Sequence, residues 1–304
     1  MNKRGKLGVL AILLVLVAGL TTNFLLNAHL DVLNPAGEIA TKERNLIMIT
    51  ALLAVIIVVP VFALTGYIVW KFREGKNSKY TPDWDHSPVL ETIWWGLPMA
   101  IITILAVITW NSSHQLDPFR PLASDKAPLN VQVIALDWKW LFIYPDEKIA
   151  SVNYLRIPIN RSVNFAITSD APMNSFWVPR LGGQIYAMSG MSTQLHLMAD
   201  QTGVFNGSSA NISGRGFAGM DFKVQAVNQN QFDNWADLVR ASPNNLNFAE
   251  YSKLARPSEN NKVAIYAEPA DNLYDSVVTQ YMGAGHSLAG QTYNSEGAGH
   301  EHSH

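Results

Sequence analysis

Two long apolar runs separated by a charged stretch dominate the first third of the chain. The run from Leu46 to Trp70 contains no charged residue, and the run from Val89 to Trp110 contains one, Glu91. At about 1.5 Å per helical residue, each run is long enough to cross a hydrocarbon core of roughly 30 Å. We therefore predict two transmembrane helices, over 46–70 and 89–110, that form a hairpin.

The loop 71–88 between the two runs predicts their orientation. It begins KFREGKNSKY, which contains four basic residues and one acidic residue. Short positively charged loops stay in the cytoplasm. Everything after Trp110 is then expected outside the cytoplasm, which means the periplasm if the cell has two membranes. The sequence thus predicts a multi-pass protein of a bacterial inner membrane.

Residues 1–30 contain a third, shorter apolar run. Lys3, Arg4 and Lys6 precede apolar residues from Leu7 to Leu20. This layout is typical of a secretory signal. A third transmembrane helix is the alternative, because no A-x-A cleavage site follows.

From residue 129 to residue 227 the pattern changes to alternation of apolar and polar positions. The segments VQVIAL, SVNFAIT, TQLHLMA and DFKVQAV are β-branched or aromatic, with Pro, Gly, Asn and Asp between them. Short strands at this spacing favour an all-β sandwich of about 100 residues.

The remainder, 228–282, becomes polar and helical in pattern. FDNWADLVR places Phe232, Trp235 and Val239 on one face of a helix, with Leu238 beside them. NFAEYSKLARP and DNLYDSVVTQYM predict two more short helices. The tail 283–304 is rich in Gly, Ser and His, and we expect it to be disordered.

Composition excludes several kinds of chemistry. The chain has no cysteine, so disulfides, thiolate nucleophiles and Cys-based metal sites are absent. A net charge of −2 implies no basic surface for nucleic acid. The sequence shows no Ser–His–Asp arrangement and no phosphate-binding loop.

Four stretches, taken in order, resemble one protein family. They are SPVLETIWWGLP, LDWKWLFIYP, APMNSFWVPRLGGQIYAMSGM and GSSANISGRGFAGM. Over residues 31–282 the chain resembles subunit II of the haem–copper respiratory oxidases, and within that family the bo-type ubiquinol oxidase branch. The resemblance implies a membrane α-helical hairpin, a cupredoxin-like Greek-key β-sandwich and a short helical C-terminal extension.

The resemblance also locates a copper site that this chain has lost. In cytochrome c oxidases of the family, a His before S-F/W-x-V-P and a loop C-x-E-x-C-x-x-x-H-x-x-M bind two copper ions. Thiolates, imidazoles and thioethers are the ligands that copper prefers, and Ser hydroxyls or a phenyl ring do not replace them. Only Met220 is retained; the other positions are occupied by Asn174, Ser209, Asn211, Ser213 and Phe217.

The resemblance implies a function without a redox centre in this chain. The complex would oxidise ubiquinol, reduce oxygen to water and pump protons, with its haems and remaining copper in subunit I. This chain would pack on subunit I and cap it. One alternative is a membrane-anchored periplasmic binding protein that carries copper for oxidase assembly. A second is the same subunit in a menaquinol oxidase.

Glu91 is the candidate functional residue in the membrane. Ionisable residues in membrane segments often mark proton paths. In the family, a Glu at this position of the motif lies at the entrance of a proton-uptake channel of subunit I. The alternative is a carboxylate near the cytoplasmic surface that pairs with a basic residue of subunit I.

Aromatic and histidine residues elsewhere predict packing rather than chemistry. We expect Trp138, Trp140 and Phe142 to pack in the sandwich or against subunit I, although the family offers a Trp near position 138 to cytochrome c. His196 is expected inside the sandwich, and His86 and His114 at the membrane interface. The tail histidines could share a metal ion loosely, or be solvated; they are His286, His300, His302 and His304.

Overall fold

The computed structural model describes residues 30–73 and 87–282. The chain forms two compact units. One contains the helices up to Thr109 together with Pro179–Gly182, and the other contains Trp110–Val178 and the chain from Gly183 onward. The predicted signal-like segment 1–30 lies outside the described residues except for Leu30. His86 and the tail 283–304 also lie outside them.

The first unit contains a short 3-10 helix, η1 (Asp31–Leu33), and two long helices, α2 (Glu38–Lys71) and α3 (Pro88–Gln115). Both long helices are apolar and long enough to cross a membrane. Their apolar side chains are largely exposed, as in helices that need lipid or other helices around them. This agrees with the predicted hairpin.

Helix α2 begins at Glu38, two turns before the predicted start at Leu46. Its first turns are polar, and Lys42 Nζ lies 2.6 Å from Glu38 Oε1. These residues form helix readily although they break the apolar run. The hydrophobic pattern therefore marks the membrane-spanning part of α2 and misses its polar beginning.

The start of α2 is fastened to the segment Pro179–Gly182. The backbone amide of Ala36 donates to the carbonyl of Arg180 at 2.7 Å, and that of Ala40 donates to the carbonyl of Leu181 at 3.1 Å. The Arg180 side chain donates in return to the carbonyl of Asn34 at 2.7 Å. These contacts pair backbone donors at the helix start that have no partner within the helix.

The second unit is a β-sandwich, which confirms the predicted fold class. Its first sheet has six strands in the order β11-β3-β2-β1-β5-β8. These strands are β11 (Ala264–Ala267), β3 (Ile149–Val152), β2 (Lys139–Tyr144), β1 (Leu129–Leu136), β5 (Val163–Ser169) and β8 (Thr193–Leu197). Strands β1 and β5 are parallel, and the other neighbours in this sheet are antiparallel.

The second sheet has five strands in the order β4-β10-β9-β6-β7. They are β4 (Tyr154–Pro158), β10 (Asp221–Val227), β9 (Gly203–Ser209), β6 (Asn174–Trp177) and β7 (Ile185–Ala187). A cluster of buried rings fills the space between the sheets: Trp140, Phe142, Phe165, Phe176 and Phe222. Trp140 and Phe142 therefore pack in the sandwich, as predicted.

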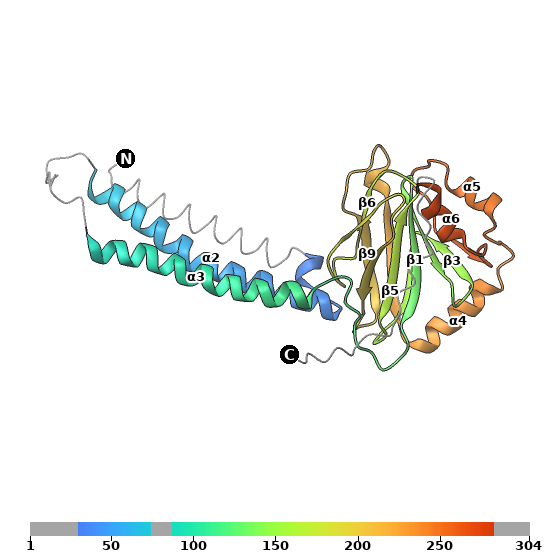
Figure 1. Ribbon diagram of the computed structural model, residues 1–304, viewed down its shortest axis with the longest axis horizontal. Helices are drawn as coiled ribbons and strands as arrows, with labels where there is room; N and C mark the ends of the chain where they lie inside the picture. The colour runs from blue at the N-terminus through green and yellow to red at the C-terminus, as the bar shows by residue number, and fades with distance from the viewer. Residues whose placement is uncertain (1–29, 74–86, 283–304) are drawn as a thin grey trace, which may run out of the picture. The chain divides into compact units, whose positions relative to one another are not determined.

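The C-terminal extension covers part of the six-stranded sheet (Figure 1). It consists of α4 (Gln229–Arg240), α5 (Phe248–Leu254), β11 and α6 (Leu273–Gln280). The prediction of three short helices is confirmed, but the strand β11 was not predicted. Leu238 was expected beside the buried face of α4 and is instead 71% exposed.

Candidate functional site

The loop that resembles a copper loop joins β9 to β10. It leaves β9 after Ser209, contains the short 3-10 helix η2 (Phe217–Gly219) and enters β10 after Met220. Strand β6, which begins with Asn174, pairs with the end of β9, so Phe176 lies opposite Ser209. The fold thus brings the start of β6 and the start of the loop together.

Hydrogen bonds among amides and hydroxyls occupy the place of the lost ligands. Ser209 Oγ donates to Asn174 Oδ1 at 3.1 Å and lies 3.2 Å from the carbonyl of Asn211. Asn211 Nδ2 donates to the carbonyl of Met173 at 2.8 Å, and Asn174 Nδ2 donates to that of Pro172 at 2.7 Å. Three of the predicted positions, 174, 209 and 211, are therefore joined in one network.

The other predicted positions stay outside this network. Met220 is fully buried, and the Ser213 hydroxyl is buried without a hydrogen-bond partner in the described part of the chain. Phe217 begins η2. Within the described residues, no hydrogen bond links these three side chains to Asn174 or Ser209.

The donors at this loop do not fit copper. Within residues 30–73 and 87–282, no group of three or more His, Cys, Asp or Glu residues could hold a metal ion. The available side-chain donors are neutral amide and hydroxyl oxygens and one thioether, whereas copper sites of this fold need thiolate and imidazole. Of these oxygens, Asn174 Oδ1 and Ser209 Oγ are already used in a hydrogen bond to each other.

Trp138 packs on this loop rather than in the sandwich core. It lies in the turn between β1 and β2 with a φ of 62°, which is unusual for a bulky residue. A Cβ at Gly216 would lie 2.5 Å from Trp138 Cδ2, and one at Gly214 would lie 3.1 Å from Cζ2. The two glycines therefore give the indole the space it occupies.

Lys139, the residue after Trp138, joins the sandwich to the C-terminal extension through hydrogen bonds of its side chain. Its side chain is almost fully buried, and burial lowers its pKa from the ordinary value. Its Nζ donates to the carbonyls of Leu254 and Arg256, both at 2.8 Å, and to Ser258 Oγ at 2.7 Å. A buried ammonium needs such acceptors, because it has lost its water.

The segment 258–261 in turn supports the loop. Arg215 Nε lies 2.6 Å from Glu259 Oε1. A Cβ at Gly219 would lie 2.6 Å from Asn260 Oδ1, so the Asn260 side chain lies against the Gly219 backbone. Sequence reasoning missed Lys139 and this segment, because nothing in the strand pattern indicates that Lys139 points inward.

Asp170 holds the last two helices of the extension. Tyr251 Oη of α5 donates to Asp170 Oδ2 at 2.5 Å, and Tyr281 Oη, just after α6, donates to Oδ1 at 2.6 Å. Burial and the neighbouring carboxylate raise the pKa of Tyr251. The carboxylate therefore joins the end of β5 to α5 and to the end of α6.

Glu91 lies in the first turn of α3 and is partly buried. Its backbone amide donates to the carbonyl of Ser87 at 2.9 Å. A carboxylate in this position is favoured by the positive end of the helix dipole. Trp94 and Trp95 follow one turn later and are exposed, as expected for residues at a membrane interface.

The side chains of His114 and His196 each contact a backbone carbonyl. His196 is 8% exposed, and its Nδ1 lies 2.9 Å from the carbonyl of Pro118, which confirms a satisfied sandwich residue. His114 Nδ1 lies 2.7 Å from the carbonyl of Trp110, and the two ring centroids lie 4.9 Å apart with the ring planes tilted by 47°. His86 and the tail histidines lie outside the described residues.

Comparison with known families identifies both parts of the outer unit. Residues 147–227 match the model of the cytochrome c oxidase subunit II periplasmic domain. Residues 240–285 match the aromatic-rich motif of the same oxidases. This motif covers most of the extension, including Tyr251 and Tyr281.

Curated relatives cover most of the chain. It is 50% identical over 252 residues to cytochrome bo(3) ubiquinol oxidase subunit 2 of Pseudomonas putida, covering 83% of this chain and 80% of the relative. It is 45% identical to ubiquinol oxidase subunit 2 of Acetobacter aceti, covering 87% of each. Quinol oxidase subunit 2 of Bacillus cereus is 39% identical, covering 75% of this chain and 79% of the relative. The chain belongs to the subunit II family of haem–copper oxidases, in its ubiquinol oxidase branch.

Proposed function

We propose that this chain serves a proton-pumping ubiquinol oxidase as a subunit without a redox centre. The observation that carries this is the copper-type loop whose donors have become hydrogen-bonded amides and hydroxyls at Asn174, Ser209 and Asn211. Electrons would then enter the complex from ubiquinol without passing through the sandwich. Haems and copper would be held by subunit I.

The relatives support ubiquinol over other donors. Relatives named ubiquinol oxidase subunits are 41–50% identical to this chain, while relatives named simply quinol oxidase are 38–39% identical. Menaquinol stays the alternative donor. The relatives cited above do not favour a free-standing copper carrier, for which a single membrane anchor would suffice.

In this arrangement the helices α2 and α3 pack on subunit I and the sandwich lies in the periplasm. Support comes from the long exposed apolar surfaces of both helices and from the basic residues of the loop 71–88. With no metal to join β6 to the loop, hydrogen bonds, Trp138 and the extension hold the loop in place. The family match to a periplasmic domain agrees with this side of the membrane.

The donor is tested by oxygen uptake of the complex purified through this chain. With ubiquinol as the donor we expect turnover, and with reduced cytochrome c we expect none. Menaquinol is the third donor to compare. Turnover with cytochrome c would refute the proposal, and the absence of any co-purifying haem protein would favour the copper carrier.

We further propose that Glu91 lies at the entrance of a proton path into subunit I. The support is its place as a carboxylate at the start of a membrane helix, at the position where the family has such a Glu. Charged side chains in membrane segments are costly and are usually retained for function.

Glu91→Ala is expected to slow proton uptake in vesicles severalfold while the complex still assembles. Glu38→Ala is the matched control, because Glu38 lies in the first turn of the other helix and pairs with Lys42. Glu91→Asp should retain most of the rate. Normal proton uptake and turnover in Glu91→Ala would remove this residue from the mechanism.

A further inference from the structure

The outer face of the six-stranded sheet is divided into a covered half and an open half. The extension covers β3, β2 and the end of β1 with an apolar cluster that includes Ile134, Leu141, Leu246 and Leu273. The open half lies over the start of β1, over β5 and over β8. Helix α6 packs against β5 at the boundary between the two halves.

Strand register arranges polar side chains across the open half in two rows. Asn130, Asn164 and His196 lie opposite one another on β1, β5 and β8. Gln132, Ala166 and Gln194 form the next row. Amide and imidazole groups therefore form much of the floor of the open half.

Two pockets adjoin over these rows. A pocket of about 420 Å³ lies over both rows, with Phe119 and Pro121 among its lining residues. A pocket of about 720 Å³ lies between the sheet and the start of α6. Both are lined by Gln132 and Pro145, so they form one continuous depression, which we call the outer groove.

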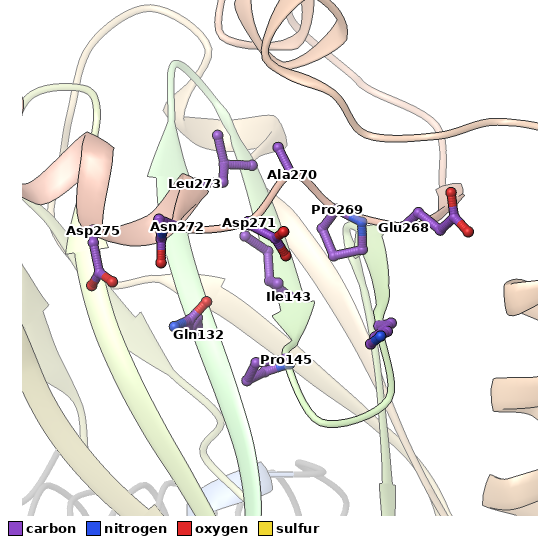
Figure 2. A pocket seen from close by; sticks show the side chains of 11 residues that line it. Gln132, Ile143, Pro145, Glu268, Pro269, Ala270, Asp271, Asn272, Leu273 and Asp275 are labelled. Carbon is purple, nitrogen blue, oxygen red and sulfur yellow. The ribbon is translucent and has the colours of Figure 1, made fainter.

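The α6 end of the outer groove is acidic. Figure 2 shows Asp271 and Asp275 on one side of the larger pocket, with Gln132 and Pro145 on the other. Glu268 also lines this pocket, and Lys148 is the one basic residue among its lining residues. Asp271 and Asp275 are exposed, and no cation of the described residues lies within 4.0 Å of either. Negative potential in a concave surface attracts a complementary cation.

The opposite end of the outer groove has a different character. Phe119 is 54% exposed at its rim, and the floor there carries amides rather than charges. From β8 to β2 the groove crosses three strand spacings of about 4.8 Å each. That length suits about four or five residues of extended polypeptide at about 3.3 Å per residue.

We propose that the outer groove binds an extended segment of another subunit of the oxidase. That segment places a Lys or Arg side chain between Asp271 and Asp275 and an apolar side chain against Phe119. Amides of the floor pair with its backbone. The tail 283–304 of this chain is a poor occupant, because it contains no Lys or Arg and carries two Glu residues.

The test places a photo-crosslinking residue at Gln132 in the intact complex. Oxygen uptake is measured first, so that loss of the oxidase itself is recognised separately. We expect a crosslink to another oxidase subunit, at a segment that contains Lys or Arg. The same crosslinker at Val204, which is 61% exposed on β9 of the other sheet, is the matched control and should not give this product.

Charge reversal supplies the second measurement. Asp271→Lys with Asp275→Lys is expected to lower the crosslink yield at least fivefold while oxygen uptake persists. Asp233→Lys, on the exposed side of α4, should leave the yield unchanged. A crosslink only within this chain or only to lipid, or a yield insensitive to the double reversal, would overturn the proposal.

Discussion

Gly207 on β9 is the position where one added methyl group should do most damage. A Cβ there would lie 2.1 Å from Phe222 Cζ and 2.2 Å from Cε2, whereas ordinary contacts are 3.4–4 Å. The ring would have to retreat by more than about 1 Å. Phe222 is 1% exposed and cannot simply turn into solvent.

The surroundings of Phe222 determine the cost of Gly207→Ala. The ring stacks on Phe176 with centroids 5.2 Å apart and an interplanar angle of 12°, and it lies 5.2 Å from the ring of Phe142. Overpacking a close-packed core costs about 1–3 kcal/mol, and more when neighbours cannot move. Alanine recovers about 0.5–1 kcal/mol of backbone entropy relative to glycine. We therefore expect Gly207→Ala to lower the free energy of unfolding by about 3 kcal/mol.

Thermal melting of the full chain in detergent, followed by near-ultraviolet circular dichroism, measures this effect. A loss of about 3 kcal/mol corresponds to a fall of roughly 6–12 °C in the midpoint for a domain of this size. Gly203→Ala on the same strand is the control, because its nearest contact is 3.1 Å from one edge atom of Phe205. Phe222→Leu in the Gly207→Ala background should restore part of the loss. Equal midpoints for Gly207→Ala and Gly203→Ala would refute the packing argument.

Three further predictions follow from the loop and the extension. Lys139→Met removes three hydrogen bonds and deprives the carbonyls of Leu254 and Arg256 of their lysine donor, so amide hydrogen exchange in residues 248–261 should accelerate at least tenfold. Lys223→Met, at an exposed position of β10, is the control. Burial raises the pKa of three Tyr residues most strongly: Tyr144, Tyr251 and Tyr274. Above pH 10 the unfolded chain loses Tyr protons that the folded chain keeps, so the free energy of unfolding should fall by about 1.4 kcal/mol per pH unit for each buried Tyr. Urea titration at pH 9–11.5 measures this fall. Unchanged urea midpoints across that range would contradict the burial of these hydroxyls. Copper ligands can be supplied at all five lost positions by Asn174→His, Ser209→Cys, Asn211→Glu, Ser213→Cys and Phe217→His. The fivefold variant should retain copper through dialysis and absorb visible light, whereas a variant with the other three replacements but without the two Cys should not.

The sequence was sufficient where hydrophobic periodicity and structure agree. Alternation predicted β1, β5, β8 and β10, and the apolar runs predicted the two long helices. It failed for β11, because the segment Ala264–Ala267 is short and becomes a strand only by pairing with distant β3. It also failed for Leu238, because the buried stripe of α4 follows Phe232, Trp235 and Val239 and leaves the next position in solvent.

The sequence named the residues of the candidate site but did not predict the hydrogen bonds between them. Family resemblance named Asn174, Ser209 and Asn211, yet only coordinates show that their side chains and backbones bond to one another. Lys139 could not be predicted, since a lysine in a strand usually points to solvent and here points into acceptors supplied by a remote segment. Such long-range partners have no local signature in the sequence.

The pairing of β3 with β11 has a consequence for how the chain is made. Until residues Ala264–Ala267 have been synthesised and can pair, β3 is an edge strand with unpaired backbone groups. Lys139 likewise lacks the carbonyl of Leu254, which lies 115 residues further along the chain. Open edges invite pairing with other chains. A newly translocated sandwich therefore stays vulnerable to aggregation until almost the last residues of the extension have crossed the membrane. Truncations within the extension should consequently affect the yield of the protein before they affect its chemistry.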